Sequence, residues 1–318
     1  MPIECNKELF AAYCGLIASG YDLTDEKDRA AQALALRIRT VCFSPEITAY
    51  FRHARAGRLE INPYYPRGSD LAAACFFLDR PLAECLAFLE QAGSPEAKDA
   101  DFIAWIARLP RFLKKIEACG AFPALWQEHQ TIIAQRGRGY QKVLTDAQSA
   151  LDAHRFSDGT RLIFSPALLQ APCLADYVRR DKCLYLIASR CTMEAVLHEY
   201  LHKAVREFRP QWEALLAQAD CTRFVNLERV RVAGYLRQDT AQERLHAFED
   251  GVVRGLTGVL AGYSAHSAYA RQNLKAGFLL VPSMLRYARG HSFQKTDLPG
   301  FVTGAAARFP DTTRKECS

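Results

Sequence analysis

Residues 195–205 read AVLHEYLHKAV, and this stretch governs how the rest of the chain is interpreted. His198 and His202 stand four residues apart, and Glu199 directly follows the first histidine. Because residues four apart lie on one face of an α-helix, a helix here would direct both imidazoles at one point. Two imidazoles can bind a zinc ion, and Glu199 would then reach a water bound beside them. The alternative is an ordinary amphipathic helix that carries two histidines and no metal.

The neighbouring sequence favours the helix and places strands before it. Thr192 is suited to cap the helix and Pro210 to end it. The segments GTRLIFSP (159–166) and DKCLYLIAS (181–189) are short, rich in Leu, Ile, Phe and Tyr, and bounded by Gly, Pro, Asp and Ser. Such segments predict two strands, the second of which leads into the motif helix.

Composition limits the classes of protein that need to be considered. The 318 residues are 49% hydrophobic and 24% charged, which is typical of a soluble globular protein. The formal charge of +6 comes from Lys and Arg scattered among Asp and Glu, so we expect no nucleic-acid partner. Eleven cysteines without a CxxC pair, and no apolar run long enough for a membrane span, favour free thiols, no membrane association and a cytoplasmic location.

The spacing of apolar residues along the sequence changes near residue 155. Residues 1–155 show apolar spacing of three and four residues, which predicts a helical N-terminal region. Residues 156–318 combine the two strands with further helices and hold the motif. The expected fold class is α+β, predominantly α-helical, with a small β-sheet and the motif helix. Four histidines without partner spacing are expected at the surface or as helix caps: His53, His129, His154 and His291.

The strands, the motif and the following helix resemble the zincin metallopeptidases, over roughly residues 159–263. Within that group the chain is most similar to the gluzincins, including poorly characterised bacterial members with an HEYxH core. The resemblance implies a zinc-dependent peptidase in which Glu199 activates a zinc-bound water, acting on a peptide or protein substrate. It also implies that a carboxylate from a later helix completes a site with His198 and His202. Lys203 stands where the zinc peptidase motif usually has an uncharged residue. The NExxSD sequence of the thermolysin-like pattern is absent.

The helix predicted at 241–260 offers several candidates for the third ligand. Glu249 shares a helical face with apolar residues, where an unpaired carboxylate is costly and a metal would compensate its charge. Asp250 is the alternative, although it could instead pair with Arg254 four residues on or support a ligand histidine. Glu243 and His246 are further candidates. The sequence therefore favours Glu249 and leaves Asp250 open.

Two more expectations complete the predicted active site. By their order after the third ligand, Tyr263 and His266 are candidates for stabilising the oxyanion. The strand at 181–189 is expected to form an edge beside the metal, since in zincins such a strand binds extended substrates. The competing hypothesis is a catalytically silent zincin-fold protein that binds partners and holds a structural zinc. The choice between endo- and exopeptidase action and the oligomeric state stay open.

Overall fold

The protein folds into two compact units, seen in a computed structural model that describes residues 2–55, 67–92, 94, 96–172, 174–219, 221–232 and 240–307. Most described residues are helical and the strands form one small sheet, which confirms the α+β, predominantly α class. The units do not divide at residue 155. The first comprises Met1–Leu144 and Gly159–Thr192, and the second comprises Thr145–Asp158 and Met193–Ser318.

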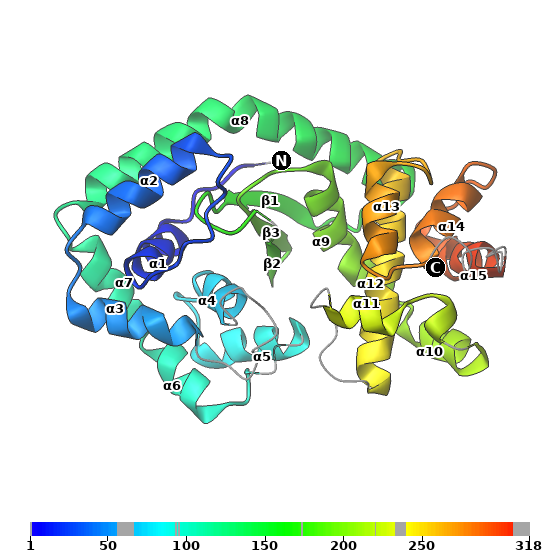
Figure 1. Ribbon diagram of the computed structural model, residues 1–318, viewed down its shortest axis with the longest axis horizontal. Helices are drawn as coiled ribbons and strands as arrows, with labels where there is room; N and C mark the ends of the chain where they lie inside the picture. Colours follow the sequence, from blue (N-terminus) through cyan, green and yellow to red (C-terminus); the bar gives the residue numbers. More distant parts are fainter. Residues whose placement is uncertain are drawn as a thin grey trace. The chain divides into compact units, whose positions relative to one another are not determined.

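The first unit is a helical array with the sheet in its later segment (Figure 1). Its helices are α1 (Lys7–Ala18), α2 (Arg29–Thr40), α3 (Pro45–Arg52), η1 (His53–Arg55), α4 (Gly68–Ala74), α5 (Leu82–Ala92), α6 (Ala100–Ala107), α7 (Leu109–Glu117) and the larger part of α8 (Phe122–Ala153).

Helix α1 is the buried centre of this array. Asn6 caps it by accepting a hydrogen bond of 2.6 Å from the Leu9 N–H, and nearly every residue from Leu9 to Ile17 is buried. Gly15 allows α3 to approach closely, because a Cβ at this position would lie 2.3 Å from the Phe51 ring. The helix therefore supplies apolar contacts on all sides.

The sheet contains both predicted strands and one that the sequence analysis missed. The three strands are β1 (Arg161–Pro166), β2 (Ala175–Arg180) and β3 (Cys183–Ala188), in the order β1-β3-β2. Strand β3 pairs parallel with β1 and antiparallel with β2. A tight turn at Asp181, whose φ is 54°, joins β2 to β3.

The prediction that residues 181–189 form an edge strand is wrong. Strand β3 is central, so its backbone N–H and C=O groups are hydrogen-bonded to β1 on one side and to β2 on the other. An extended substrate cannot add to a strand whose two edges are both paired. The missed strand β2 is the physical cause, because its short connection to β3 lets it cover the edge that the sequence analysis left open.

The second unit contains the end of α8 and every helix after residue 192 (Figure 1). Its remaining helices are α9 (Met193–Arg206), α10 (Arg209–Gln218), η2 (Cys221–Arg223), α11 (Leu227–Val232), α12 (Ala241–Leu260), α13 (Ala268–Lys275), α14 (Leu280–Ala288), η3 (Lys295–Asp297) and α15 (Leu298–Ala307).

Helix α12 is the central element of the second unit, and it packs against α9, α10 and α14. Thr240 caps it by accepting a hydrogen bond of 3.2 Å from the Glu243 N–H. Gly255 allows the close packing on α14, because a Cβ there would lie 2.2 Å from the Met284 sulfur. This packing buries Glu249 and Thr257 of α12 among the neighbouring helices.

His129 is buried, contrary to the expectation of a surface or capping residue. It lies in α8 at 2% exposure, and its ring centroid is 4.4 Å from that of Phe10 and 5.3 Å from that of Trp126. Its Nδ1 has no hydrogen-bond partner in the described part of the chain. Burial lowers the pKa of His129 to about 3, because the cation would lose its hydration.

This burial predicts that protonation destabilises the first unit. An unfolded histidine has a pKa of about 6.5, so between about pH 6.5 and 3 the unfolded chain binds a proton that folded His129 does not. The free energy of unfolding therefore falls as the pH falls through this range. His129→Gln removes the effect, and relative to wild type it should gain up to about 1.4 kcal/mol per pH unit between pH 6 and 4.

Urea unfolding at a series of pH values measures this difference. His266→Gln, at an exposed position, controls for the loss of an imidazole elsewhere in the chain. A difference between His129→Gln and wild type that does not change with pH would show that His129 accepts a proton in the folded state.

Candidate metal centre

The motif segment forms the helix that the sequence predicts. Residues 193–206 are helical in α9, and Glu194 in the first turn interacts favourably with the helix dipole. Val196, Leu197 and Leu201 are fully buried, which anchors one side of the helix. The two histidines are four residues apart, so their side chains lie on one face of α9.

The two imidazoles of α9 face each other. Nε2 of His198 and Nε2 of His202 are 3.1 Å apart, and the rings meet edge to face at a centroid distance of 4.7 Å. The His198 side chain is 19% exposed. Both nitrogens therefore point at one small, largely desolvated volume.

Asp250 of α12 supplies a carboxylate to the same volume. Its Oδ1 lies 3.3 Å from Nε2 of His198, and ligand atoms of His198, His202 and Asp250 all lie within 4.8 Å of one another. A tetrahedral zinc ion bound at about 2.0–2.1 Å holds its ligand atoms about 3.3 Å apart. The two short separations are close to this value, so these residues could hold a metal ion.

The protonation states of the imidazoles also favour a cation between them. Burial lowers the pKa of His198 to about 4 and that of His202 to about 3, and its effect exceeds the opposing effect of the Asp250 charge. Both rings are therefore neutral at pH 7. A neutral imidazole nitrogen carries either a proton or a lone pair, so Nε2 of His198 cannot donate to Asp250 and also accept from His202. A metal ion accepts lone pairs from all three groups and removes this conflict.

Arg254 holds the Asp250 carboxylate in position and in its charged form. Its Nε donates to Oδ2 of Asp250 at 2.8 Å, while Oδ1 faces His198. Arg254 is itself fixed by Asn273 at 3.2 Å and by the Phe278 ring, 4.4 Å below the guanidinium. Burial raises the pKa of Asp250, but the charge of Arg254 and its hydrogen bond act in the opposite direction, and the pKa is lowered overall. The carboxylate is therefore ionised and oriented for binding.

Glu249, which the sequence favours as the third ligand, has a different partner. Both of its carboxylate oxygens accept hydrogen bonds from Arg209 of α10, at 2.9 and 2.6 Å. Glu249 is only 4% exposed, so its charge does need compensation, as the sequence argument held, but a guanidinium provides it. Asp250, the alternative, joins the histidines in the group that could hold a metal ion. The likeness to gluzincins in particular is therefore not supported at this position.

The other predicted residues lie outside this group of three. Glu199 is on α9, directly after His198 and three residues before His202, at 8% exposure. The Tyr263 hydroxyl donates a hydrogen bond to Glu194, one helical turn before His198. His266 is exposed, and its backbone carbonyl accepts a hydrogen bond from Arg271. Their catalytic roles stay predictions.

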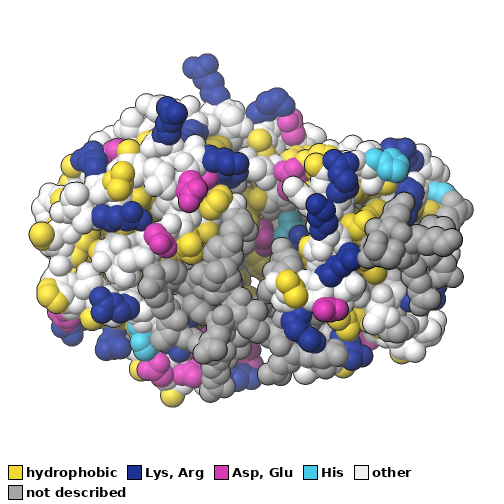
Figure 2. Space-filling view, in the orientation of Figure 1, with side chains coloured by type: hydrophobic (Ala, Val, Ile, Leu, Met, Phe, Trp, Pro, Cys, Tyr) yellow, Lys and Arg dark blue, Asp and Glu magenta, His cyan; other side chains and the backbone are white. Residues whose placement is uncertain are grey.

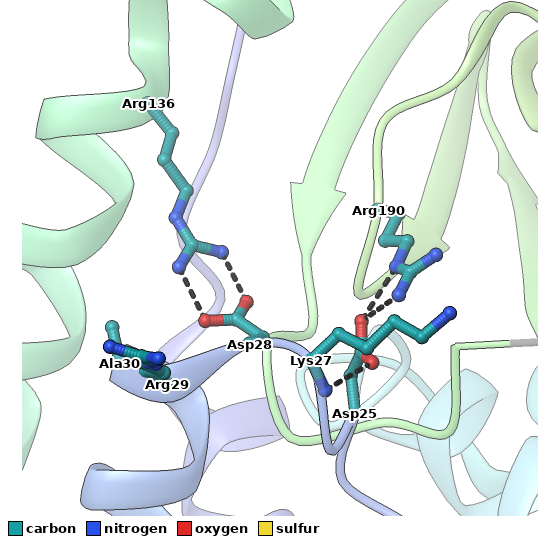
Figure 3. A pocket seen from close by; sticks show the side chains of 7 residues that line it. All are labelled: Asp25, Lys27, Asp28, Arg29, Ala30, Arg136 and Arg190. Atoms are coloured by element: carbon teal, nitrogen blue, oxygen red, sulfur yellow. Dashed lines mark hydrogen bonds and ion pairs between the residues drawn. The ribbon is translucent and has the colours of Figure 1, made fainter.

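A polar pocket of about 570 Å³ lies in the first unit and was not predicted (Figure 3). Arg136 donates two hydrogen bonds to Asp28, at 2.6 and 2.7 Å, and Arg190 pairs with Asp25. These arginines are neutralised by the carboxylates that they hold, so they offer little charge to a ligand. The lining residues are Asp25, Lys27, Asp28, Arg29, Ala30, Arg136 and Arg190.

On the face shown in Figure 2, Lys and Arg side chains are interspersed with Asp, Glu and apolar side chains. The absence of a nucleic-acid partner stays a prediction. None of the described helices is both long and apolar enough to cross a membrane.

Comparison of the chain with protein-family models, curated proteins and solved structures finds no match.

The geometry predicts that Asp250, and not Glu249, is required for metal binding. Purified wild-type protein should bind one zinc ion, and His198→Ala and Asp250→Ala should each weaken binding by more than about 100-fold, because each removes a ligand. Glu249→Ala should keep zinc and instead lower the free energy of unfolding by about 1–3 kcal/mol, since it leaves Arg209 without its partner. Zinc titration and urea unfolding measure the two effects separately. Loss of zinc in Glu249→Ala with retention in Asp250→Ala would reverse the assignment.

Proposed function

We propose that this protein is a zinc-dependent hydrolase that cleaves peptide or amide bonds. The observation that supports it most directly is the convergence of two neutral imidazoles and one ionised carboxylate, with a glutamate beside the first histidine. Two nitrogens and one oxygen are a donor set common in catalytic zinc sites. The resemblance of the motif to zincins agrees with this reading.

Each residue has a defined task in the proposed reaction. His198, His202 and Asp250 would hold the ion, and Arg254 would keep Asp250 turned toward it. When bound, zinc would supply Lewis acidity that polarises the scissile carbonyl and makes a coordinated water more acidic. Glu199 accepts a proton from the attacking water and then donates it to the nitrogen of the leaving amine. The water oxygen forms a bond to the carbonyl carbon and the C–N bond of the amide breaks. The proton taken from water ends on the leaving amine.

The number of ligands favours catalysis over a structural metal. Structural zinc sites are usually closed by four protein ligands, whereas catalytic sites have three and keep one position for water or substrate. Among the described residues, the group that could hold the ion contains three. A structural site also has no use for a general base, yet Glu199 adjoins both histidines, one position after His198 and one turn from His202. These features argue against the catalytically silent alternative.

Replacing Glu199 separates metal binding from catalysis. Glu199→Gln keeps the size of the side chain but cannot accept the proton of water, so we expect unchanged zinc content and a loss of kcat by about 10²–10⁴-fold. A fluorogenic peptide library with cleavage mapping by mass spectrometry, run with zinc-loaded protein, measures the activity. Glu207→Gln, the same change just after α9, is the matched control. Parent activity in Glu199→Gln would refute this mechanism.

A further inference from the structure

A cavity of about 350 Å³ in the first unit is lined by the start of α1 and by the sheet. Its walls are formed by residues 4–8, by residues that follow α4 and by one residue from each of the three strands. Residues 2–4 are bonded to β1, because the Glu4 N–H donates to the Phe164 carbonyl at 2.9 Å and the Phe164 N–H donates to the Pro2 carbonyl at 3.1 Å. Small-molecule sites have volumes of about 300–1,000 Å³, so the cavity can hold a small organic ligand.

Ser165 of β1 gives this cavity a buried hydroxyl that lacks a partner. The residue is 0% exposed, and its Oγ forms no hydrogen bond with any described residue. Ile163 of β1 pairs with Tyr185 of β3, so Ser165, two residues later, shares a sheet face with Tyr185, and both line the cavity. A buried hydroxyl without a hydrogen bond is costly. A polar group of a molecule in the cavity would remove this cost.

The two cationic residues that line the cavity are already paired. Lys7 donates a hydrogen bond of 2.6 Å to Glu117. Arg180 donates to both carboxylate oxygens of Asp79 and, at 2.7 Å, to the Phe76 carbonyl. Neither side chain has charge left for a ligand, so the cavity does not favour an anion.

Glu8 is an acidic residue of the cavity that lacks such a partner. Asp79 is paired with Arg180, and Glu4 lies 4.0 Å from Arg161. No lysine, arginine or histidine in the described part of the chain forms an ion pair with Glu8, and no described group donates a hydrogen bond to its carboxylate. The cavity therefore presents a negative charge that a cationic ligand would neutralise.

The charge of Glu8 acts on the buried side of the cavity. Burial raises the pKa of the Cys75 thiol, which also lines the cavity, and the charge of Glu8 raises that pKa further. Glu8 lies in the first turn of α1, where the helix dipole stabilises its negative charge but does not neutralise it. The carboxylate is therefore held ionised next to the cavity.

Two aromatic rings give the cavity an apolar wall. The Phe76 and Tyr185 rings have centroids 5.1 Å apart and are tilted by 48°. Such rings pack against an apolar ligand, and their faces attract a cation. An ammonium group has three N–H donors, enough for a carboxylate and a hydroxyl acceptor together. Aromatic rings, a free carboxylate and a free hydroxyl thus suit a molecule with an apolar body and one ammonium group.

We propose that this cavity binds a small organic monoamine in its protonated form, with the ammonium group bonded to Glu8 and Ser165 and the apolar body against Phe76 and Tyr185. The site belongs to the first unit, whereas the residues of the candidate metal centre belong to the second, so the inference does not depend on the proposed hydrolase function.

The test compares two probes that differ in charge and are nearly equal in size. Phenethylamine, protonated at pH 7 because its pKa is close to the value of about 10 for a lysine, and neutral 2-phenylethanol are titrated into the purified full chain. Ligand-observed NMR measures both dissociation constants. We expect phenethylamine to bind at least about 10-fold more tightly, because only the amine forms a charged hydrogen bond.

Glu8→Gln assigns this preference to the carboxylate. It should weaken the binding of phenethylamine by about 10- to 100-fold and leave that of 2-phenylethanol unchanged, which also shows that the cavity is intact. Glu84→Gln is the matched control, since Glu84 lies in the first turn of α5 in the same unit and outside the cavity. It should change neither dissociation constant.

Ser165→Ala tests the hydroxyl by two measurements. It should weaken the binding of phenethylamine by about 2- to 10-fold. Without ligand, it should not lower the free energy of unfolding in urea, because the hydroxyl has no partner to lose. Ser19→Ala removes a buried hydroxyl that donates to the Leu16 carbonyl at 2.7 Å, so it should lower that free energy.

Three results would overturn the proposal. The first is equal binding of phenethylamine and 2-phenylethanol, and the second is an equal effect of Glu8→Gln and Glu84→Gln. The third is no saturable binding of phenethylamine up to millimolar concentrations, which would show that the cavity holds only water. Destabilisation by Ser165→Ala as large as that by Ser19→Ala would show that Ser165 has a partner in the folded chain and would overturn its role in the site.

Discussion

The packing of α12 against α9 is the constraint on which the metal centre depends. It brings the Asp250 carboxylate to 3.3 Å from an imidazole that already lies 3.1 Å from its neighbour. It also removes water from these groups, which keeps the imidazoles neutral at pH 7. Without this contact the motif would be a pair of histidines on a helix. With it, three lone-pair donors face one point.

The same packing places charged groups in a low-dielectric environment, and most of them are compensated within the unit. Arg209 binds both oxygens of Glu249, and Arg254 binds the Asp250 oxygen that does not face His198. The pair of Glu249 with Arg209 joins α12 to α10 and restricts the rotation of α12, because a buried carboxylate without its guanidinium would be costly. Arg209 thus helps to orient the helix that carries Asp250, and Arg254 orients the Asp250 carboxylate within that helix.

The sequence was informative wherever the signal was local. The spacing of His198 and His202 predicted a shared helical face, and the apolar segments 159–166 and 181–189 predicted β1 and β3. It was less informative wherever the answer depended on a distant partner. Glu249 and Asp250 are adjacent, so they point about 100° apart on the helix. The packing of α12 against α9 and the pairing of Glu249 with Arg209, forty residues earlier, decide which one faces the histidines. Strand β2 and the pairing of Tyr263 with Glu194 are likewise tertiary results.

X-ray absorption at the zinc edge of protein loaded with one equivalent of zinc reports which atoms bind the ion. We expect a four-coordinate ion with two imidazole nitrogens at about 2.0–2.1 Å and oxygen donors at about 2.0–2.2 Å. These imidazole signals should be lost in His198→Ala. A spectrum dominated by sulfur at about 2.3 Å, or one without imidazole scattering, would contradict this expectation.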